Sequence, residues 1–262
     1  MRLQIFEYMA TYKKTSSKVK KTQEGVEDHS TTAEVFSTLD ETASRSERWV
    51  LKNQKIILIA LGAIVVLILG YLGYTKYILG PKEKEAANEL AFPKAYFEEA
   101  MTNSVAADSL FTLALNGADG KFGFIDIADD YSGTKAGNLA NYYAGLSFLK
   151  TKKYKEAIDY LEDFSSKDEL LGPIAKGAIG DAFADINQPK DALEYYLKAA
   201  DAKDNNFTSP LFLFKAGNTA IELGDNSKAL EIFNKIKENY PLSDEAKDIE
   251  IYINKATFAS EK

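Results

Sequence analysis

The sequence predicts an all-α protein in which one N-terminal transmembrane helix is followed by a solenoid of repeated helix pairs. Two observations carry this prediction. Residues 56–75 form an uncharged apolar segment, and the pattern of small and large residues after Asn138 recurs every 35 to 37 residues. An uncharged segment of about 20 residues is typical of a membrane-spanning helix, and a repeat of 20–50 residues is typical of a solenoid.

The apolar segment reads IILIALGAIVVLILGYLGYT and contains no charged side chain. A helix rises about 1.5 Å per residue, so this segment covers roughly the 30 Å thickness of the hydrocarbon core. We predict a transmembrane helix over residues 56–79. Its anchoring residues include Trp49, Ile56, Leu69, Tyr71 and Tyr74, because aromatic rings favour the two interfaces. The alternative is a buried helix of a soluble core, but no other segment is apolar enough to surround it.

Orientation follows from the charges on either side of the span. Residues 1–55 hold ten Lys or Arg against eight Asp or Glu, whereas residues 81–262 hold 21 against 31. Basic residues favour the cytoplasmic side, although the loop rule gives acidic residues little weight. We therefore predict a cytoplasmic N-terminus and a C-terminal domain outside the membrane.

The N-terminal part divides into two predicted segments. Residues 1–34 are poor in large apolar groups, so we expect a disordered cytoplasmic tail. Either Met1 or Met9 fits as the true start. Residues 35–55 carry apolar positions at helical spacing and predict an amphipathic juxtamembrane segment. A weakly helical, solvated lead-in is the alternative for this segment.

After the span, Gly80 and Pro81 predict a short hinge, because proline disrupts a helix interior. Residues 84–137 show helical patterns and predict a degenerate repeat of about two helices. Within them, the glycine-rich residues 116–123 predict a turn-rich loop. A phosphate-binding loop is disfavoured because no strand precedes it and no Lys-Ser/Thr pair follows.

Three segments then repeat the same arrangement, and we place them at residues 138–172, 173–209 and 210–243, followed by a closing helix at 244–259. Three columns coincide in them: Gly145, Gly180 and Gly217; Ala157, Ala192 and Ala229; and Leu161, Tyr196 and Phe233. This pattern is typical of the helix-turn-helix tetratricopeptide repeat (TPR), with small residues at a close helix crossing and bulky ones filling the gap. The whole domain is predicted to span residues 80–262.

Stacked TPR units form a right-handed curved array whose first helices line a concave groove. We expect the groove to bind protein through Tyr142, Leu146, Lys150, Asp181, Asp185, Phe214, Asn218 and Glu222. Leu139, Ile174 and Leu211 occupy neighbouring positions but are expected to pack between helices. A groove without a closed pocket suits a polypeptide better than a small molecule.

Composition argues against catalysis and against several ligand classes. The only histidine, His29, lies in the predicted tail, and the chain has no cysteine. The outer domain therefore lacks a nucleophile–base pair and the usual zinc ligands. Its acidic balance disfavours a nucleic-acid partner. We predict no enzyme activity, no cofactor and no metal.

The layout of residues 45–262, with one span and an external TPR array, resembles the YfgM-like ancillary subunits of the bacterial SecYEG translocon. The resemblance implies a single-pass bacterial inner-membrane protein with a periplasmic C-terminal domain. It also implies a non-catalytic scaffold that works beside translocon subunits, with a membrane-anchored periplasmic chaperone, on secreted polypeptides. The alternative is a scaffold of another envelope machine, for outer-membrane protein or cell-wall biogenesis.

Overall fold

The computed structural model describes residues 31–260, with side chains from Trp49 onward, and every regular element in this range is a helix. The predicted all-α class is confirmed. The chain divides into two compact units between Leu67 and Ile68. Most of the predicted disordered tail lies outside the described residues. Its last four residues, 31–34, differ from the prediction because they already belong to a helix.

The apolar segment lies in helix α1, Thr31–Tyr74, which also contains the predicted juxtamembrane residues 35–55. A π-helical turn, η1 (Thr75–Leu79), connects α1 to α2, Gly80–Thr102. From Trp49 to Thr102 this is one helix, long and apolar enough to cross a membrane, and none of its most apolar window is buried inside the protein. That exposure contradicts a buried core helix. All the predicted anchoring residues are more than half exposed: Trp49, Ile56, Leu69, Tyr71 and Tyr74.

The predicted hinge at Gly80 and Pro81 is wrong. Gly80 has helical angles, φ −62° and ψ −49°, and Pro81 lies in the first turn of α2. Proline lacks an N–H and clashes with the carbonyl four residues back in a regular α-helix. The π-helical turn widens the backbone just before Pro81, where the Gly80 N–H donates to Thr75 O, five residues back. The helix therefore continues through the proline.

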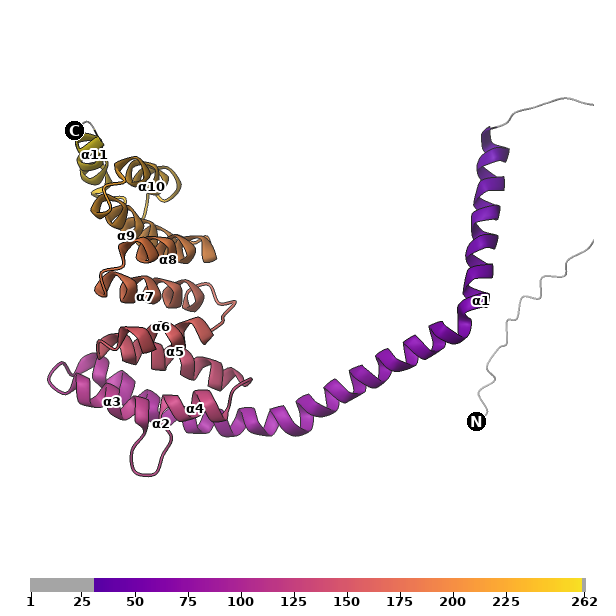
Figure 1. Ribbon diagram of the computed structural model, residues 1–262, viewed down its shortest axis with the longest axis horizontal. Coiled ribbons are helices and arrows are strands. Elements are labelled where there is room, and N and C mark those ends of the chain that lie inside the picture. Colours follow the sequence, from indigo (N-terminus) through magenta and orange to yellow (C-terminus); the bar gives the residue numbers. More distant parts are fainter. Residues whose placement is uncertain (1–30, 261–262) are drawn as a thin grey trace, which may run out of the picture. The chain divides into compact units, whose positions relative to one another are not determined.

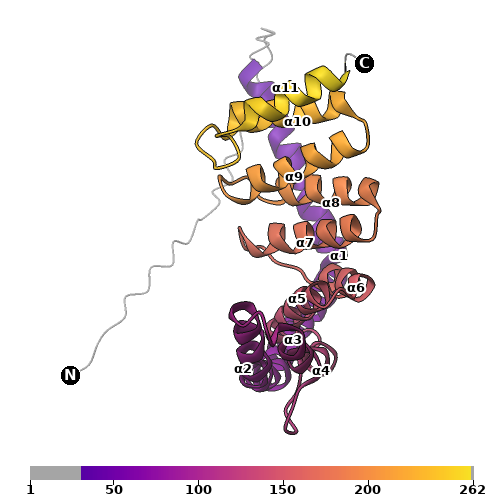
Figure 2. The same cartoon turned by 90° about the vertical axis from the view of Figure 1, so that its left-hand side faces the viewer.

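The compact unit Ile68–Lys262 is a stack of helices that follow one another in chain order (Figures 1 and 2). After α2, the helices are α3 (Ala107–Asn116), α4 (Phe124–Asp130), α5 (Lys135–Lys150), α6 (Tyr154–Asp163), α7 (Leu171–Asp185), α8 (Pro189–Ala202), α9 (Thr208–Glu222), α10 (Asn226–Asn239) and α11 (Ile249–Ser260). The pairs α5–α6, α7–α8 and α9–α10 each begin two or three residues before the corresponding predicted repeat.

The closing helix is shorter than predicted. α11 begins at Ile249 instead of residue 244, because residues 241–248 form turns. Ser243 is buried there, and its Oγ accepts a hydrogen bond from the Ala246 N–H at 3.2 Å. Serine side chains that bond the nearby backbone compete with helix formation.

The predicted close crossing of paired helices is confirmed by the glycine column. A Cβ atom on Gly145 would lie 2.5 Å from Leu161 Cγ, one on Gly180 2.7 Å from Tyr196 Cδ1, and one on Gly217 2.3 Å from Phe233 Cε1. Each large side chain therefore occupies the space that a missing Cβ leaves. All three alanines of the second column are fully buried beside these crossings: Ala157, Ala192 and Ala229.

Gly177 marks a close contact that the repeat columns do not reveal. A Cβ there would lie 1.9 Å from Phe212 Cε1. Phe212 belongs to α9, in the next repeat, so this glycine allows α7 and α9 to approach each other.

The first turn of α2 is joined to the start of α5 by one carboxylate. Glu83 Oε2 accepts from the Lys135 N–H at 2.7 Å, and its Oε1 accepts from the Ala136 N–H at 3.1 Å. Thr134 Oγ1 accepts from the Gly137 N–H at 2.9 Å. The first N–H groups of a helix have no partner within that helix. Glu83 therefore caps α5 from a distant part of the chain and fixes α2 against the array.

Replacing Glu83 with alanine is expected to destabilise the array by about 0.5–2 kcal/mol, the usual cost of losing a helix cap. Denaturant unfolding of the detergent-solubilised chain, followed by circular dichroism, measures this loss. Hydrogen exchange should also become faster in the first turn of α5. Glu98→Ala is the control, because Glu98 lies on the same helix in an exposed ion pair with Lys94. Equal effects of the two substitutions would contradict the capping role.

Candidate protein-binding groove

Three of the predicted groove residues line one open hollow. It has a volume of about 380 Å³ and lies where the ends of α5 and α7 meet the start of α6 and the middle of α8. Lys150 comes from the end of α5, whereas Asp181 and Asp185 come from α7. The other lining residues are Leu149, Lys152, Tyr154, Ala184 and Tyr196.

Asp181 is held in place by two neighbours from different helices. The Tyr196 hydroxyl donates to Asp181 Oδ1 at 2.7 Å, and Lys215 Nζ lies 2.7 Å and 2.8 Å from the two carboxylate oxygens. Burial raises the pKa of Tyr196, and the negative charge of Asp181 raises that pKa further. Asp181 thus joins α7, α8 and α9, and its charge is offset by a lysine. It builds the wall of the hollow and supplies little net charge to a ligand.

Lys150, Lys152 and Asp185 are the exposed charges of the hollow. Asp185 lies beside Tyr154, whose pKa is raised mainly by desolvation and then by the charge of this carboxylate. A basic donor, an acidic acceptor and two tyrosine rings thus border the same open space. Such groups can bind charged side chains and backbone amides of a polypeptide. Among the side chains that the structure describes, from Trp49 to Ser260, no group of three or more His, Cys, Asp or Glu is arranged to hold a metal ion.

Tyr142 does not line the groove, which corrects the sequence prediction. It is only 7% exposed and packs against Phe164 and Tyr143, with ring centroids 5.1 Å and 5.4 Å away. Burial raises the pKa of Tyr142 to about 12. Leu146 is half-buried and packs against two core clusters. The α6–α7 connection covers this part of α5, because it brings Phe164 onto the tyrosine.

Phe214 is also a packing residue rather than a groove residue. Its ring lies 4.7 Å from that of Tyr252 in α11 and 6.2 Å from that of Phe233 in α10. The half-buried Asn218 donates from Nδ2 to Phe214 O at 3.0 Å. Glu222, at the end of α9, is exposed. The closing helix therefore occupies the side of α9 that was predicted to bind protein.

The expectation that three other apolar residues pack between helices is confirmed. Leu139, Ile174 and Leu211 are half-buried, and each packs against a core cluster.

Sequence reasoning did not assign Tyr154, Tyr196 or Lys215 to the hollow. One signal would have found part of this set. Lys215 follows Asp181 by 34 residues, and Lys235 follows Asp201 by the same number, with an Nζ–Oδ1 distance of 3.2 Å. Oppositely charged residues one repeat apart lie at equivalent places of adjacent units, where they can pair.

A second hollow, of about 800 Å³, lies between α4, α5 and α6. Its charged lining is mostly acidic, with Asp129, Asp159 and Asp163 against Lys135. Burial raises the pKa of Tyr160 in this hollow, and Asp129 raises it further. No predicted groove residue lies there.

These helix pairs define the class of the domain as an α-solenoid. More specifically, residues 142–207 and residues 212–243 match models of the tetratricopeptide repeat. No curated protein and no solved structure matches the chain. TPR arrays provide extended concave surfaces for other proteins, which makes a protein-interaction scaffold the functional class.

Proposed function

We propose that this chain is a non-catalytic, membrane-anchored scaffold whose concave surface binds polypeptide in the periplasm, beside the SecYEG translocon and its periplasmic chaperones. The observation that carries the proposal is the open hollow bordered by Lys150 and Asp185, within the residues that match TPR models. An exposed pair of opposite charges beside two tyrosines suits an extended chain with charged and amide groups.

The fixed wall of the hollow supports this function. Asp181, Tyr196 and Lys215 come from three successive helices, and Tyr196 and Lys215 each contact Asp181 within 2.8 Å. A surface that is ordered before binding loses less conformational entropy when a ligand arrives. The scaffold can thus present Lys150 and Asp185 at fixed positions.

The apolar helix supports the membrane part of the proposal. It is long enough to cross a bilayer, and its most apolar window is fully outside the protein core. With the N-terminus in the cytoplasm, the array lies on the periplasmic side of the bacterial inner membrane. The translocon and chaperones are the partners that the layout of the chain implies.

Site-specific photocrosslinking in intact cells tests the partner. A photoreactive residue replaces Asp185 in the hollow, and the same residue replaces Asp191 on α8 as the control, since both aspartates are exposed. We expect translocon subunits, periplasmic chaperone or secreted chains to crosslink from position 185 more than from position 191. Crosslinks to outer-membrane or cell-wall assembly proteins would favour the other envelope scaffold. Equal products from both positions would contradict binding in the groove.

The charged contacts should also show in binding strength. Replacing Lys150 or Asp185 with alanine is expected to weaken binding of a captured polypeptide about two- to fivefold, since an exposed charged contact contributes up to ~1 kcal/mol. Thermal unfolding should stay unchanged, because both side chains are exposed. Titration of the purified chain with a crosslinked partner's peptide measures the affinity. Unchanged affinity in both variants would place the binding surface elsewhere.

A further inference from the structure

Three large apolar side chains are exposed on successive loops between repeats. Leu170, before α7, is 44% exposed; Phe207, before α9, is 65% exposed; and Leu242, after α10, is 97% exposed. We call these three residues the loop ridge. Exposed apolar side chains that gather into a patch mark sites of contact with a protein or a membrane.

Two of these loops have the same construction. Asp168 Oδ1 accepts from the N–H groups of Leu170 and Leu171, at 2.8 Å and 2.9 Å. One repeat later, Asn205 Oδ1 accepts from the N–H groups of Phe207 and Thr208, at 2.9 Å and 2.7 Å. Each cap holds the apolar residue outside the helix that follows. The exposure of Leu170 and Phe207 is therefore built into the repeat.

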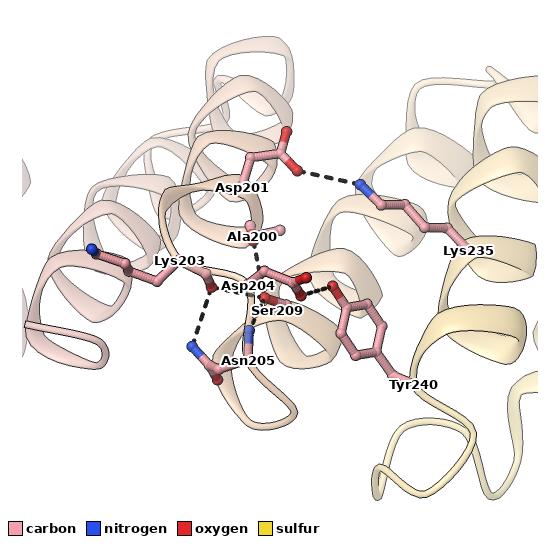
Figure 3. A network of polar contacts seen from close by, with 8 residues as sticks. All are labelled: Ala200, Asp201, Lys203, Asp204, Asn205, Ser209, Lys235 and Tyr240. Atoms are coloured by element: carbon pink, nitrogen blue, oxygen red, sulfur yellow. Dashed lines mark hydrogen bonds and ion pairs between the residues drawn. The ribbon is translucent and has the colours of Figure 1, made fainter.

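Hydrogen bonds also join the loops to one another. Asn205 Nδ2 donates to Glu169 O at 3.2 Å, and the Tyr240 hydroxyl donates to Asp204 Oδ1 at 2.6 Å. Figure 3 shows the second of these contacts and, next to it, Ser209 Oγ donating to Ala200 O at 3.0 Å. The three loops thus form one continuous edge of the array.

The apolar helix enters the array at this same edge. Glu83, in the first turn of α2, contacts the start of α5, and Phe97 further along α2 contacts Tyr143 further along α5, so the two helices run in the same direction. α7 and α9 are likewise parallel, since Glu169 meets Asn205 and Asp181 meets Lys215. The starts of α2, α5, α7 and α9 therefore lie at one edge. Residues 68–79, the last part of the apolar helix, lead into it.

Charge argues for an apolar rather than an electrostatic contact. Three aspartates of these loops have partners within the edge: Asp168 binds backbone N–H groups, Asp204 accepts from Tyr240, and Asp244 pairs with Lys247. Lys167 and Lys203 lie on the same loops as acidic residues, so no basic patch forms there. Anionic lipids attract clusters of basic residues, which the three loops of the ridge lack.

We propose that the loop ridge rests on the outer leaflet of the bilayer that the apolar helix crosses, with Phe207 and Leu242 inserted between lipid headgroups. This inference rests on the proposed membrane anchor, and it does not depend on polypeptide binding. The anchor holds the ridge close to the lipid surface, so each apolar side chain needs only weak intrinsic affinity.

Lipid contact can be measured on the full chain in phosphatidylcholine nanodiscs. The chain has no cysteine, so single cysteines label cleanly. An environment-sensitive fluorophore is placed at Phe207→Cys or Leu242→Cys on the ridge, and at Leu69→Cys in the apolar helix. Val105→Cys is the matched control, because Val105 is also 97% exposed but follows the end of α2, at the opposite edge. Nitroxide-bearing phosphatidylcholine serves as the quencher.

We expect strong quenching at positions 69, 207 and 242 and weak quenching at 105, unchanged when the salt concentration rises. A Leu170→Ser, Phe207→Ser and Leu242→Ser variant, labelled at Asn206→Cys, should lose quenching relative to the chain labelled at position 206 alone. Quenching at the ridge positions that is no stronger than quenching at position 105 would overturn the inference. A blue shift of the fluorophore without quenching by lipid would overturn it too, because protein would then cover the ridge. Quenching at position 69 alone would contradict lipid contact by the loop ridge but neither the membrane anchor nor the groove. No quenching at position 69 would contradict the membrane anchor as well.

Discussion

Replacing Phe233 with alanine is expected to lower the free energy of unfolding by about 3–5 kcal/mol, the usual cost of truncating a buried phenylalanine. Phe233 is fully buried in α10 and fills the space that Gly217 leaves in α9. No side chain at position 217 can close the resulting cavity. Denaturant unfolding of the detergent-solubilised chain, followed by circular dichroism, measures the loss. Hydrogen exchange should become faster in α9, α10 and α11.

A double-mutant cycle separates this crossing from ordinary core packing. Gly217→Ala alone is expected to destabilise by about 1–3 kcal/mol, because the new methyl group overlaps the Phe233 ring. The first repeat has leucine opposite its glycine, at Leu161 and Gly145. Gly217→Ala combined with Phe233→Leu should therefore cost less than the sum of the two single changes. Additive losses would mean that the two residues do not share the crossing.

The repeat itself is predictable from sequence because one local rule creates it three times. A residue without a side chain must face a large one wherever two helices cross closely, so glycine and its partner recur together. The predicted hinge at Pro81 is wrong because the proline was considered without the backbone that precedes it. A π-helical turn over residues 75–79 accommodates the proline, and nothing in the residue types marks that turn.

Groove membership is less predictable, because it depends on segments outside the repeat. Lys150 and Asp185, at the ends of α5 and α7, line an open hollow, and their binding of polypeptide stays a prediction. Phe214 was misplaced because α11 brings Tyr252 against it. Standard positions of a helix pair say which way a side chain points. They do not say which later segment packs on it.

Tyr142 is another residue that a later segment of the chain covers, here the α6–α7 connection. Tyr142→Ala is expected to lower the free energy of unfolding by about 3–5 kcal/mol, by analogy with other large aromatic truncations. The side chain is 7% exposed and packs between the first two repeats, against Phe164 and beside Ile158 and Ile179. Denaturant unfolding measures the change, and hydrogen exchange should locate it in α5, α6 and α7.

Tyr142→Phe is the matched control, and it should cost less than about 1.5 kcal/mol because the ring and its volume remain. Burial raises the pKa of this hydroxyl to about 12, so the group is neutral near pH 7 and removing it deletes no charge. Polypeptide capture by Tyr142→Ala should fall only under conditions where the array begins to unfold. A Tyr142→Ala variant that kept full stability but no longer bound polypeptide would mean that Tyr142 belongs to the binding surface. The α6–α7 connection would then have to move away from α5 when polypeptide binds.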